Sequence, residues 1–411
     1  MLKKRIKSTL RRLQRSGIYA AAILVPDELV ARVVRSTQKG TPERSLSVLV
    51  AAPGNGNIGD QAMLEAYLAA TPGSVMIYEQ AEGLVRIPTE HQGRVRTVAS
   101  LNLIRGLPGF RLAAVARFAK SASRAKAVTL VGADLMDGLY NTNASLARAS
   151  VLRVASLQGA QTNVLGFSWS PDWVPTAAGA LKRTQSETAI YARDPLSYAR
   201  LKDAGVTQTK ISADVVFTTR DTEAYSEFDR WQRDGQNDGK YAVVNASGLL
   251  ASRADQKAEY GRVIAAIREQ GHSRIVFLPH VIRKDHSDAQ AVSEVHSAFG
   301  TENDLLITGE CTPAQVRGIA RNASVVFTGR MHLAIMSLGQ GTPAMTISTQ
   351  GKVEGLYEMF GLSSWALPSD GGFASLAGEL LRSTDLDAVR RQILTRLPKV
   401  IELAEANFES R

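Results

Sequence analysis

An arginine and a histidine stand two positions apart in TGRMHLAIM (residues 328–336), where a predicted strand is followed by a predicted helix. Arg330 can neutralise an oxyanion, and His332 titrates near neutral pH and can give or take a proton. The start of a helix also favours an anion. The alternative is a buried histidine bonded to the backbone. The adjacent cation favours a reaction centre instead, and so do the following turns at 341–343 and 350–352, the second of which ends in Lys352.

A second arginine ends a predicted strand in YARDPLSYARLKDAG (residues 191–205). Asp194 and Pro195 fit the N-cap and the first position of a helix, so a capping role explains Asp194 without any function. The cap does not explain Arg193. We expect Arg193 at a cleft edge, with its guanidinium free to bind a carboxylate or a phosphate through two donors at once.

Three glycines follow the first predicted strand in PGNGNIGDQAML (residues 53–64). Gly54, Gly56 and Gly59 would let backbone amides approach an anion, but their GxGxxG spacing is weak evidence by itself. The residues equally favour a tight strand-to-helix turn capped by Asp60. Both interpretations stay open at this point.

His280 directly follows another predicted strand in LPHVIRKDH (residues 278–286). It could contact a ligand, although a histidine in a polar loop is more often only solvated. The spacing between His280 and His286 does not fit a metal site, and the sequence requires neither a metal nor a cofactor.

Strand-like apolar runs alternate with helix-like periods along most of the chain, which predicts parallel sheets covered on both faces. We therefore expect an α/β protein with two Rossmann-like doubly wound domains whose carboxyl strand ends face a cleft. The predicted strands are 46–52, 74–78, 127–132, 162–167, 188–192, 241–247, 274–278, 304–307, 324–328 and 343–347, and the helices of the second half are 256–270, 286–298, 313–322 and 331–339.

The domain plan follows from changes in composition along the chain. Residues 80–125 predict a loop with one or two helices, and the polar stretch 218–240 predicts loop and linker. The plan is a basic amphipathic N-terminal segment at 1–45, an N-terminal Rossmann-like domain at 46–220, a linker at 221–240, a C-terminal Rossmann-like domain at 241–374, and C-terminal helices packing back on the body at 375–411.

Basic charge is concentrated at the start of the chain. The net charge is +10, and the first 15 residues hold seven Lys and Arg and no acid, which leaves +3 for the other 396 residues. A nucleic-acid-binding surface is therefore not indicated. Apolar residues at 2, 6, 10 and 13 form one helical stripe, so residues 1–17 would either contact an anionic membrane or pack as a solvated helix.

The apolar run 18–25 is short, and Pro26 follows it without a small-residue cleavage site. We expect a cytoplasmic protein, peripheral on the inner face of the plasma membrane if residues 1–17 bind lipid. The single cysteine, Cys311, cannot form an internal disulfide, which agrees with this location.

Taken together, the polar stretches resemble the polysaccharide pyruvyl transferase family. The resemblance runs from residue 54 to about residue 361. Two stretches depart from the family pattern: residues 131–137 lack its glycine triplet, and residues 214–217 replace its D-P-x-F. The matching positions are Asn57, Gly59, Asp60 and Gln61, then Arg193, Asp194, Ser197 and Gly205, then Arg330, His332, Gly341, Pro343 and Lys352.

The resemblance implies a GT-B-like fold and transfer of pyruvate from phosphoenolpyruvate to two hydroxyls of one sugar, as a cyclic ketal. It implies that Arg193 and Arg330 hold the donor, that His332 acts as acid and base, and that Lys352 holds the departing phosphate. The acceptor would be a cell-envelope polysaccharide or its lipid-linked precursor. The expected substrate-binding residues are Asn57, Gly59, Asp60, Asp194, Ser197, His280 and Lys352.

Two other functions fit the sequence less well. A GT-B sugar-nucleotide glycosyltransferase would need an acid that recognises the ribose or base and a diphosphate site in the second domain, and no clear E-x7-E arrangement is present. A non-catalytic, membrane-associated family member is the second alternative, because the glycine triplet is altered. The oligomeric state is not indicated.

Overall fold

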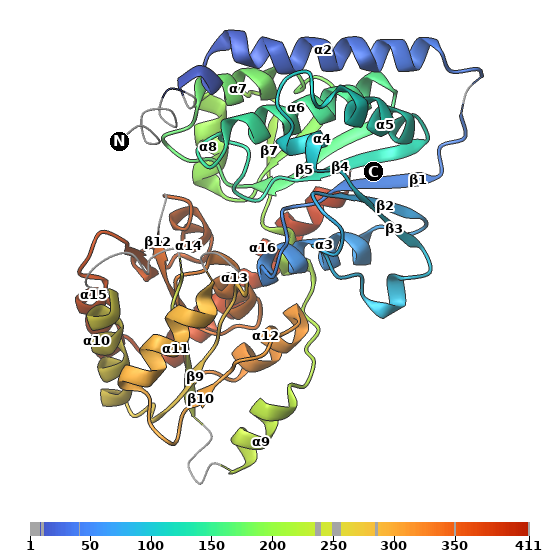
Figure 1. Cartoon of the computed structure of the whole chain (residues 1–411). Coiled ribbons are helices and arrows are strands. Elements are labelled where there is room, and N and C mark those ends of the chain that lie inside the picture. Colours follow the sequence, from blue (N-terminus) through green and yellow to red (C-terminus); the bar gives the residue numbers. More distant parts are fainter. Residues whose placement is uncertain are drawn as a thin grey trace. The chain divides into compact units, whose positions relative to one another are not determined.

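The computed structural model describes residues 9, 12–40, 42–234, 240–248, 256–283, 287–348 and 351–409. The chain forms two compact units, and both contain a parallel sheet with helices (Figure 1). Unit 1 comprises residues 1–54, 64–215 and 403–411, and unit 2 comprises residues 55–63 and 216–402.

The sheet of unit 1 has seven parallel strands in the order β3-β2-β1-β4-β5-β6-β7. The five predicted strands are confirmed, each within about two residues. The two strands that the sequence did not reveal lie at the sheet edges, where β3 is half exposed and β7 is only three residues long. The strands are β1 Leu46–Val50, β2 Val75–Glu79, β3 Val95–Ala99, β4 Ala125–Val131, β5 Gln161–Phe167, β6 Thr188–Ala192 and β7 Thr209–Ile211.

The helices of unit 1 cover this sheet, and α2 lies along α5, α6 and α7 (Figure 1). The first turns of α3 belong to unit 2 and the rest to unit 1. The stretch 80–125 holds a strand as well as the predicted helices. The helices are α2 Gly17–Ser36, α3 Ile58–Ala70, α4 Leu101–Arg105, α5 Leu112–Ser123, α6 Thr142–Leu157, α7 Pro175–Lys182 and α8 Pro195–Asp203, with 3-10 turns η1 Thr89–His91 and η2 Val215–Thr218.

Helix α2 is fixed to unit 1 by buried polar contacts as well as by apolar packing. The Asp27 carboxylate accepts from Ser150 Oγ and forms an ion pair with Arg111, 3.1 Å between Oδ2 and Nη2. Both charged side chains are almost fully buried. Burial raises the pKa of Asp27, and the opposing effects of Arg111 and Ser150 do not cancel it. Among the described residues, no helix is both long and apolar enough to cross a membrane.

The sheet of unit 2 has six parallel strands in the order β10-β9-β8-β11-β12-β13. The five predicted strands are confirmed, and the short edge strand β13 was not predicted. Counted along the unit, this order is 3-2-1-4-5-6, the Rossmann order. The strands are β8 Tyr241–Asn245, β9 Arg274–Phe277, β10 Leu305–Leu306, β11 Val325–Thr328, β12 Ala344–Ser348 and β13 Ala366–Pro368.

The predicted helices of the second half are confirmed, and part of the predicted linker is also helical. Helix α9 lies in the polar stretch 218–240, where Trp231 stacks 3.7 Å from the Arg274 guanidinium. The helices are α9 Ser226–Asp234, α10 Gln256–Glu269, α11 Asp288–Phe299, α12 Pro313–Arg321, α13 Met331–Gly339, α14 Glu354–Phe360, α15 Phe373–Ser383 and α16 Leu386–Glu405, with 3-10 turns η3 Ser363–Trp365 and η4 Ala406–Phe408.

In unit 2 the strand order reverses between β8 and β11, which pair directly, with Asn245 opposite Thr328. Ligands of open α/β sheets bind outside the carboxyl ends of the strands at such a switch point. The loops after β8, β9 and β11 are therefore the part of unit 2 where a ligand site is expected.

Replacing Asp27 with alanine leaves the buried Arg111 guanidinium without its carboxylate. We expect the free energy of unfolding of unit 1 to fall by about 3–5 kcal/mol, the usual cost of breaking a buried pair. Urea denaturation followed by Trp169 and Trp173 fluorescence, with Trp231 and Trp365 changed to phenylalanine, measures it. Asp385→Ala, which breaks an exposed pair with Arg391, should change little, and equal effects of the two changes would contradict the buried-pair argument.

Candidate active site

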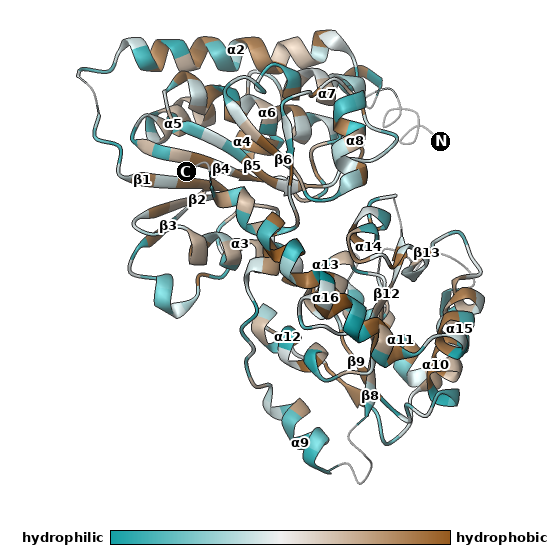
Figure 2. Ribbon diagram, turned by 180° about the vertical axis from the view of Figure 1, so that it is seen from behind, coloured by the Kyte–Doolittle hydropathy of each residue, from teal (hydrophilic) through white to brown (hydrophobic). Residues whose placement is uncertain are grey.

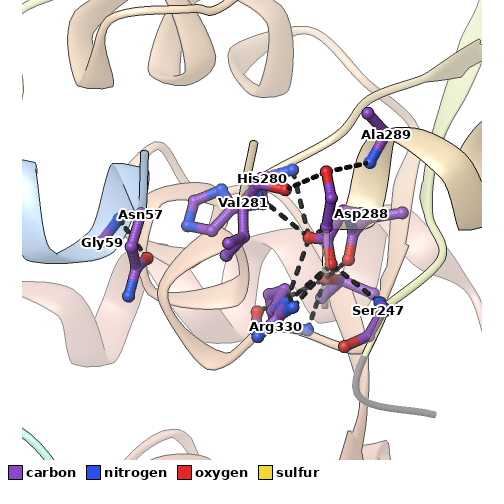
Figure 3. Close-up of polar contacts among 12 residues, drawn as sticks. Asn57, Gly59, Ser247, His280, Val281, Asp288, Ala289 and Arg330 are labelled. Atoms are coloured by element: carbon purple, nitrogen blue, oxygen red, sulfur yellow. Dashed lines mark hydrogen bonds and ion pairs between the residues drawn. The ribbon is translucent and has the colours of Figure 1, made fainter. Parts of the chain in front are cut away.

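A buried carboxylate organises the strand ends at the switch point of unit 2 (Figure 3). Asp288, the first residue of α11, is fully buried. Its oxygens accept from the side chain of Asn245 (3.2 Å) and from the backbone amides of Gly248 (2.9 Å), His280 (3.3 Å) and Val281 (3.1 Å). These donors come from the loops after β8 and β9, so one carboxylate joins both loops.

Arg330 is the strongest partner of this carboxylate. Arg330 Nη2 lies 2.6 Å from Asp288 Oδ1, and Nε lies 3.1 Å from each carboxylate oxygen. The Arg330 amide donates to Thr328 Oγ1 at 2.9 Å, which fixes the backbone where β11 ends. The guanidinium is thereby held in one orientation and its charge is matched. The sequence predicted a fixed cation beside His332, but it did not reveal the carboxylate that compensates this cation.

His332 packs against the glycine of the N-x-G turn. It is the second residue of α13, and Gly59 lies so close that a Cβ built there would be 2.4 Å from His332 Nδ1. Any side chain at position 59 would displace the imidazole, because real Cβ atoms do not approach so closely. The turn after β1 and the R-x-H stretch, 271 residues apart in sequence between Gly59 and Arg330, therefore meet in unit 2.

The glycine-rich turn is paired to the loop after β9. Asn57 forms an antiparallel bridge with Val281, and the amide of Ile282 donates to the carbonyl of Gly56 at 2.9 Å. Ile58 N donates to the carbonyl of His280 at 3.2 Å, and Gly59 N donates to Asn57 Oδ1 at 3.1 Å. These two amides are used inside the protein, so the contacts favour the structural-turn interpretation over an anion cradle.

Asp60 is the third residue of α3 rather than its N-cap, so the expected cap at Asp60 is wrong, although an acid in the first turn still favours the helix dipole. The predicted substrate contacts of Asn57, Gly59 and Asp60 remain predictions. What the geometry adds is a steric role for Gly59 beside His332.

His280 lies in the interior. It is 1% exposed, and neither ring nitrogen has a hydrogen-bond partner among the residues that the structure describes. Burial, and then the nearby His332 and Arg330, lower the pKa of His280 well below its usual range. The alternative of a solvated loop histidine is therefore wrong, and the predicted ligand contact of His280 stays a prediction. The ring is neutral at pH 7, and a proton on His332 makes a second charge at His280 unfavourable.

Other predicted positions around this site are less informative. Lys352 is buried in the turn after β12, and its substrate contact stays a prediction. His286 and Gln350 lie outside the described residues. No group of three or more His, Cys, Asp or Glu within the described ranges is placed to hold a metal ion.

The predicted residues of unit 1 form a separate buried cluster. Arg193 is 2% exposed, and its Nη1 lies 2.8 Å from Asp214 Oδ2 while its Nε donates to Ser168 Oγ at 2.8 Å. The expectation of a free guanidinium is wrong, because Asp214 compensates the charge. A contact between Arg193 and a donor substrate stays a prediction.

Asp194 and Ser197 cap α8. The Asp194 carboxylate accepts from the Ser197 amide at 2.7 Å and from the Ser197 hydroxyl at 2.6 Å. Ser197 Oγ in turn accepts from the Trp169 amide at 2.9 Å. The capping interpretation of Asp194 is confirmed, and burial raises its pKa despite these hydrogen bonds. The predicted substrate contacts of Asp194 and Ser197 stay predictions.

Sequence reasoning missed Asp288 and Asn245. The available signal was the pair Ser287-Asp288 at the start of a predicted helix, seven residues after the strand-end His280. An acidic residue in the first turn of a helix is normally interpreted as a partner of the helix dipole. The role of Asp288 as an acceptor for Arg330 depends on the strand order, which cannot be read from the sequence.

Replacing Gly59 with alanine places a methyl group against the His332 ring. We expect a loss of about 1–3 kcal/mol in the free energy of unfolding, as for other overpacked sites, and a shift of the His332 imidazole resonances. Urea denaturation and imidazole NMR measure the two effects. Gly93→Ala adds a methyl that would meet nothing within 4 Å, so a similar loss there would remove the steric explanation.

The lowered pKa of His280 predicts a pH dependence of stability. The unfolded chain binds a proton at this histidine below about pH 6.5 and the folded chain does not, so this contribution is complete above about pH 6.5. It is lost as the pH falls toward the lowered folded pKa, by about 1.4 kcal/mol per pH unit. Unfolding free energies between about pH 7.5 and 5 should fall less steeply in His280→Gln, and an unchanged slope would contradict the assignment.

Comparison with solved structures supports the fold. A protein assigned as a UDP-N-acetylglucosamine 2-epimerase from Listeria monocytogenes matches with a TM-score of 0.56 at 11% identity, covering 90% of this chain and 98% of that one. A UDP-GlcNAc 2-epimerase from Methanocaldococcus jannaschii matches with 0.53 at 9% identity, covering 85% and 99%. WaaG, a glycosyltransferase involved in lipopolysaccharide biosynthesis, matches with 0.51 at 9% identity, covering 89% and 99%.

These likenesses show two Rossmann-like domains of the GT-B type and nothing about the reaction, because the identities are so low. None of the curated proteins compared with the chain matches its sequence. The family model for polysaccharide pyruvyl transferases matches residues 57–351. This range begins at the Asn57 turn and includes the R-x-H stretch. Both segments contribute residues to the site around Asp288. The chain therefore belongs to the polysaccharide pyruvyl transferase family.

Proposed function

We propose that this protein transfers pyruvate from phosphoenolpyruvate to two hydroxyls of one sugar, forming a cyclic ketal. Family membership supports a polysaccharide pyruvyl transferase, and the donor and the ketal are the steps that we add. The observation that carries the proposal is the grouping of one guanidinium and two imidazoles after β9 and β11. Arg330, His332 and a neutral His280 would face a small anionic donor there.

The chemistry needs a proton donor at carbon and a base at oxygen. The methylene carbon C3 of phosphoenolpyruvate takes a proton, positive charge develops at C2, and a sugar hydroxyl attacks C2 and loses its own proton. The second hydroxyl then attacks C2 as the bond to the phosphate oxygen breaks. One hydroxyl proton replaces the proton given to C3, and the other leaves with the phosphate, so the step is balanced.

We assign His332 as the acid and base, because it stands in the first turn of α13, two residues after Arg330. A neutral His280 would place no second positive charge beside His332. Arg330 would donate to the carboxylate or phosphate from a fixed orientation rather than as a free charge. The N-terminus of α13 and Lys352 would hold the departing phosphate.

The acceptor would be a cell-envelope polysaccharide or its lipid-linked precursor, met at the inner face of the plasma membrane. The rival is a nucleotide-sugar reaction, because the proteins of similar fold include UDP-GlcNAc epimerases and a glycosyltransferase. The two functions differ in the donor that is consumed. Labelled phosphoenolpyruvate and labelled nucleotide sugars, each offered with a panel of glycosides and lipid-linked saccharides, separate them.

In that assay we expect phosphate release from phosphoenolpyruvate and a product heavier by one pyruvate less one water. His332→Gln should lower kcat about 10²–10⁴-fold with little change in KM, as for a lost acid and base. Arg330→Lys should lower kcat/KM about 10–100-fold, because Lys cannot form the same paired hydrogen bonds.

His91→Gln changes a histidine of unit 1 and should leave the activity unchanged. Consumption of a nucleotide sugar without any use of phosphoenolpyruvate would reject the proposal. Wild-type activity in His332→Gln would reject the assigned acid and base while leaving the donor untouched.

A further inference from the structure

Helix α2 has an apolar stripe that faces away from unit 1. Ile18, Val25, Leu29 and Val33 are separated by seven, four and four residues, so they fall on one face of a helix with 3.6 residues per turn. Ile18 is 83% exposed and Val33 is 61% exposed. Figure 2 shows hydrophobic and hydrophilic bands alternating along α2. Exposed aliphatic side chains repeated over four turns of one helix are unusual unless something covers them.

The opposite face of α2 is the packed one. Its buried residues include Tyr19, Ile23, Leu24 and Ala31, and the helix contacts α5, α6 and α7. The outward stripe is therefore held rigidly in place by unit 1.

Charge around the stripe has one sign. The first 40 residues contain ten Lys and Arg and only two acids, Asp27 and Glu28. Both acids are on the buried face, where Asp27 pairs with Arg111, and Glu28 pairs with Arg183 and Arg32. The exposed charges described in this region are all basic, namely Arg12, Arg15, Arg32, Arg35 and Lys39. A row of apolar side chains bordered only by cations complements an anionic lipid surface.

We propose that the outward face of α2 docks this protein on an anionic phospholipid bilayer. Ile18, Val25, Leu29 and Val33 enter the boundary between headgroups and acyl chains, and the bordering arginines meet lipid phosphates. A second copy of the chain fits worse, because two such faces would bring cations against cations. This surface differs from the segment 1–17 that the sequence suggested, and it does not depend on the reaction proposed above.

The test compares vesicles of phosphatidylcholine with vesicles that contain about a third phosphatidylglycerol, using the full-length protein in a sedimentation assay. We expect binding to the anionic vesicles that weakens with salt. The double variant Leu29→Asn, Val33→Asn should lower the partition coefficient about tenfold or more, because two exposed aliphatic contacts with lipid are lost. Leu376→Asn, on the exposed surface of α15 in unit 2, is the matched control and should bind as the wild type does.

A fluorescent label tests insertion directly. The one native cysteine, Cys311, is buried, and burial raises its pKa to about 12, so an environment-sensitive thiol label reacts selectively at Leu29→Cys. We expect a blue shift with anionic vesicles at position 29 and none at Leu376→Cys. Equal binding to neutral vesicles, an unchanged partition coefficient in the double variant, or a concentration-dependent blue shift without lipid would each overturn the proposal, the last by showing self-association.

Discussion

The site in unit 2 depends on the buried charge of Asp288. A carboxylate without water is very unfavourable unless donors surround it. Here the donors are the Asn245 side chain, three backbone amides and the Arg330 guanidinium. Because the amides belong to the loops after β8 and β9 while Arg330 follows β11, satisfying one charge fixes three loops. Removing that charge would leave a buried guanidinium and several orphaned amides, so this part of unit 2 is organised around one electrostatic requirement.

Arg330, which this carboxylate orients, also acts on the neighbouring His280. The Arg330 guanidinium is held in one orientation, and its charge is balanced by Asp288. The direction of its N–H groups would therefore matter more to a ligand than its net charge. Burial lowers the pKa of His280 well below its usual range, so this ring stays neutral.

Most of the fold could be predicted from apolar runs, because buried parallel strands such as Val325–Thr328 are continuously hydrophobic. The edge strands β3, β7 and β13 escaped prediction because a short or half-exposed strand lacks such a run. Within the site, Arg330, His332 and His280 could be nominated by residue type and strand-end position. Their partners could not, because Asp288 reaches Arg330 only through the crossover order of β8, β9 and β11, and Asp214 reaches Arg193 in the same way.

The two arginines show why a strand-end cation is ambiguous. Each follows a parallel strand, and each was expected to be a ligand for an anion, yet each is compensated by an aspartate of its own unit. What distinguishes them is the neighbourhood. Arg193 lies among the capping contacts of Ser168, Asp194 and Ser197, which account for these polar atoms structurally. Arg330 lies beside two imidazoles, one of which is buried without a described hydrogen-bond partner. A buried imidazole can donate to or accept from a ligand, whereas the capping contacts already use their polar atoms, so Arg330 is the stronger candidate to face a ligand.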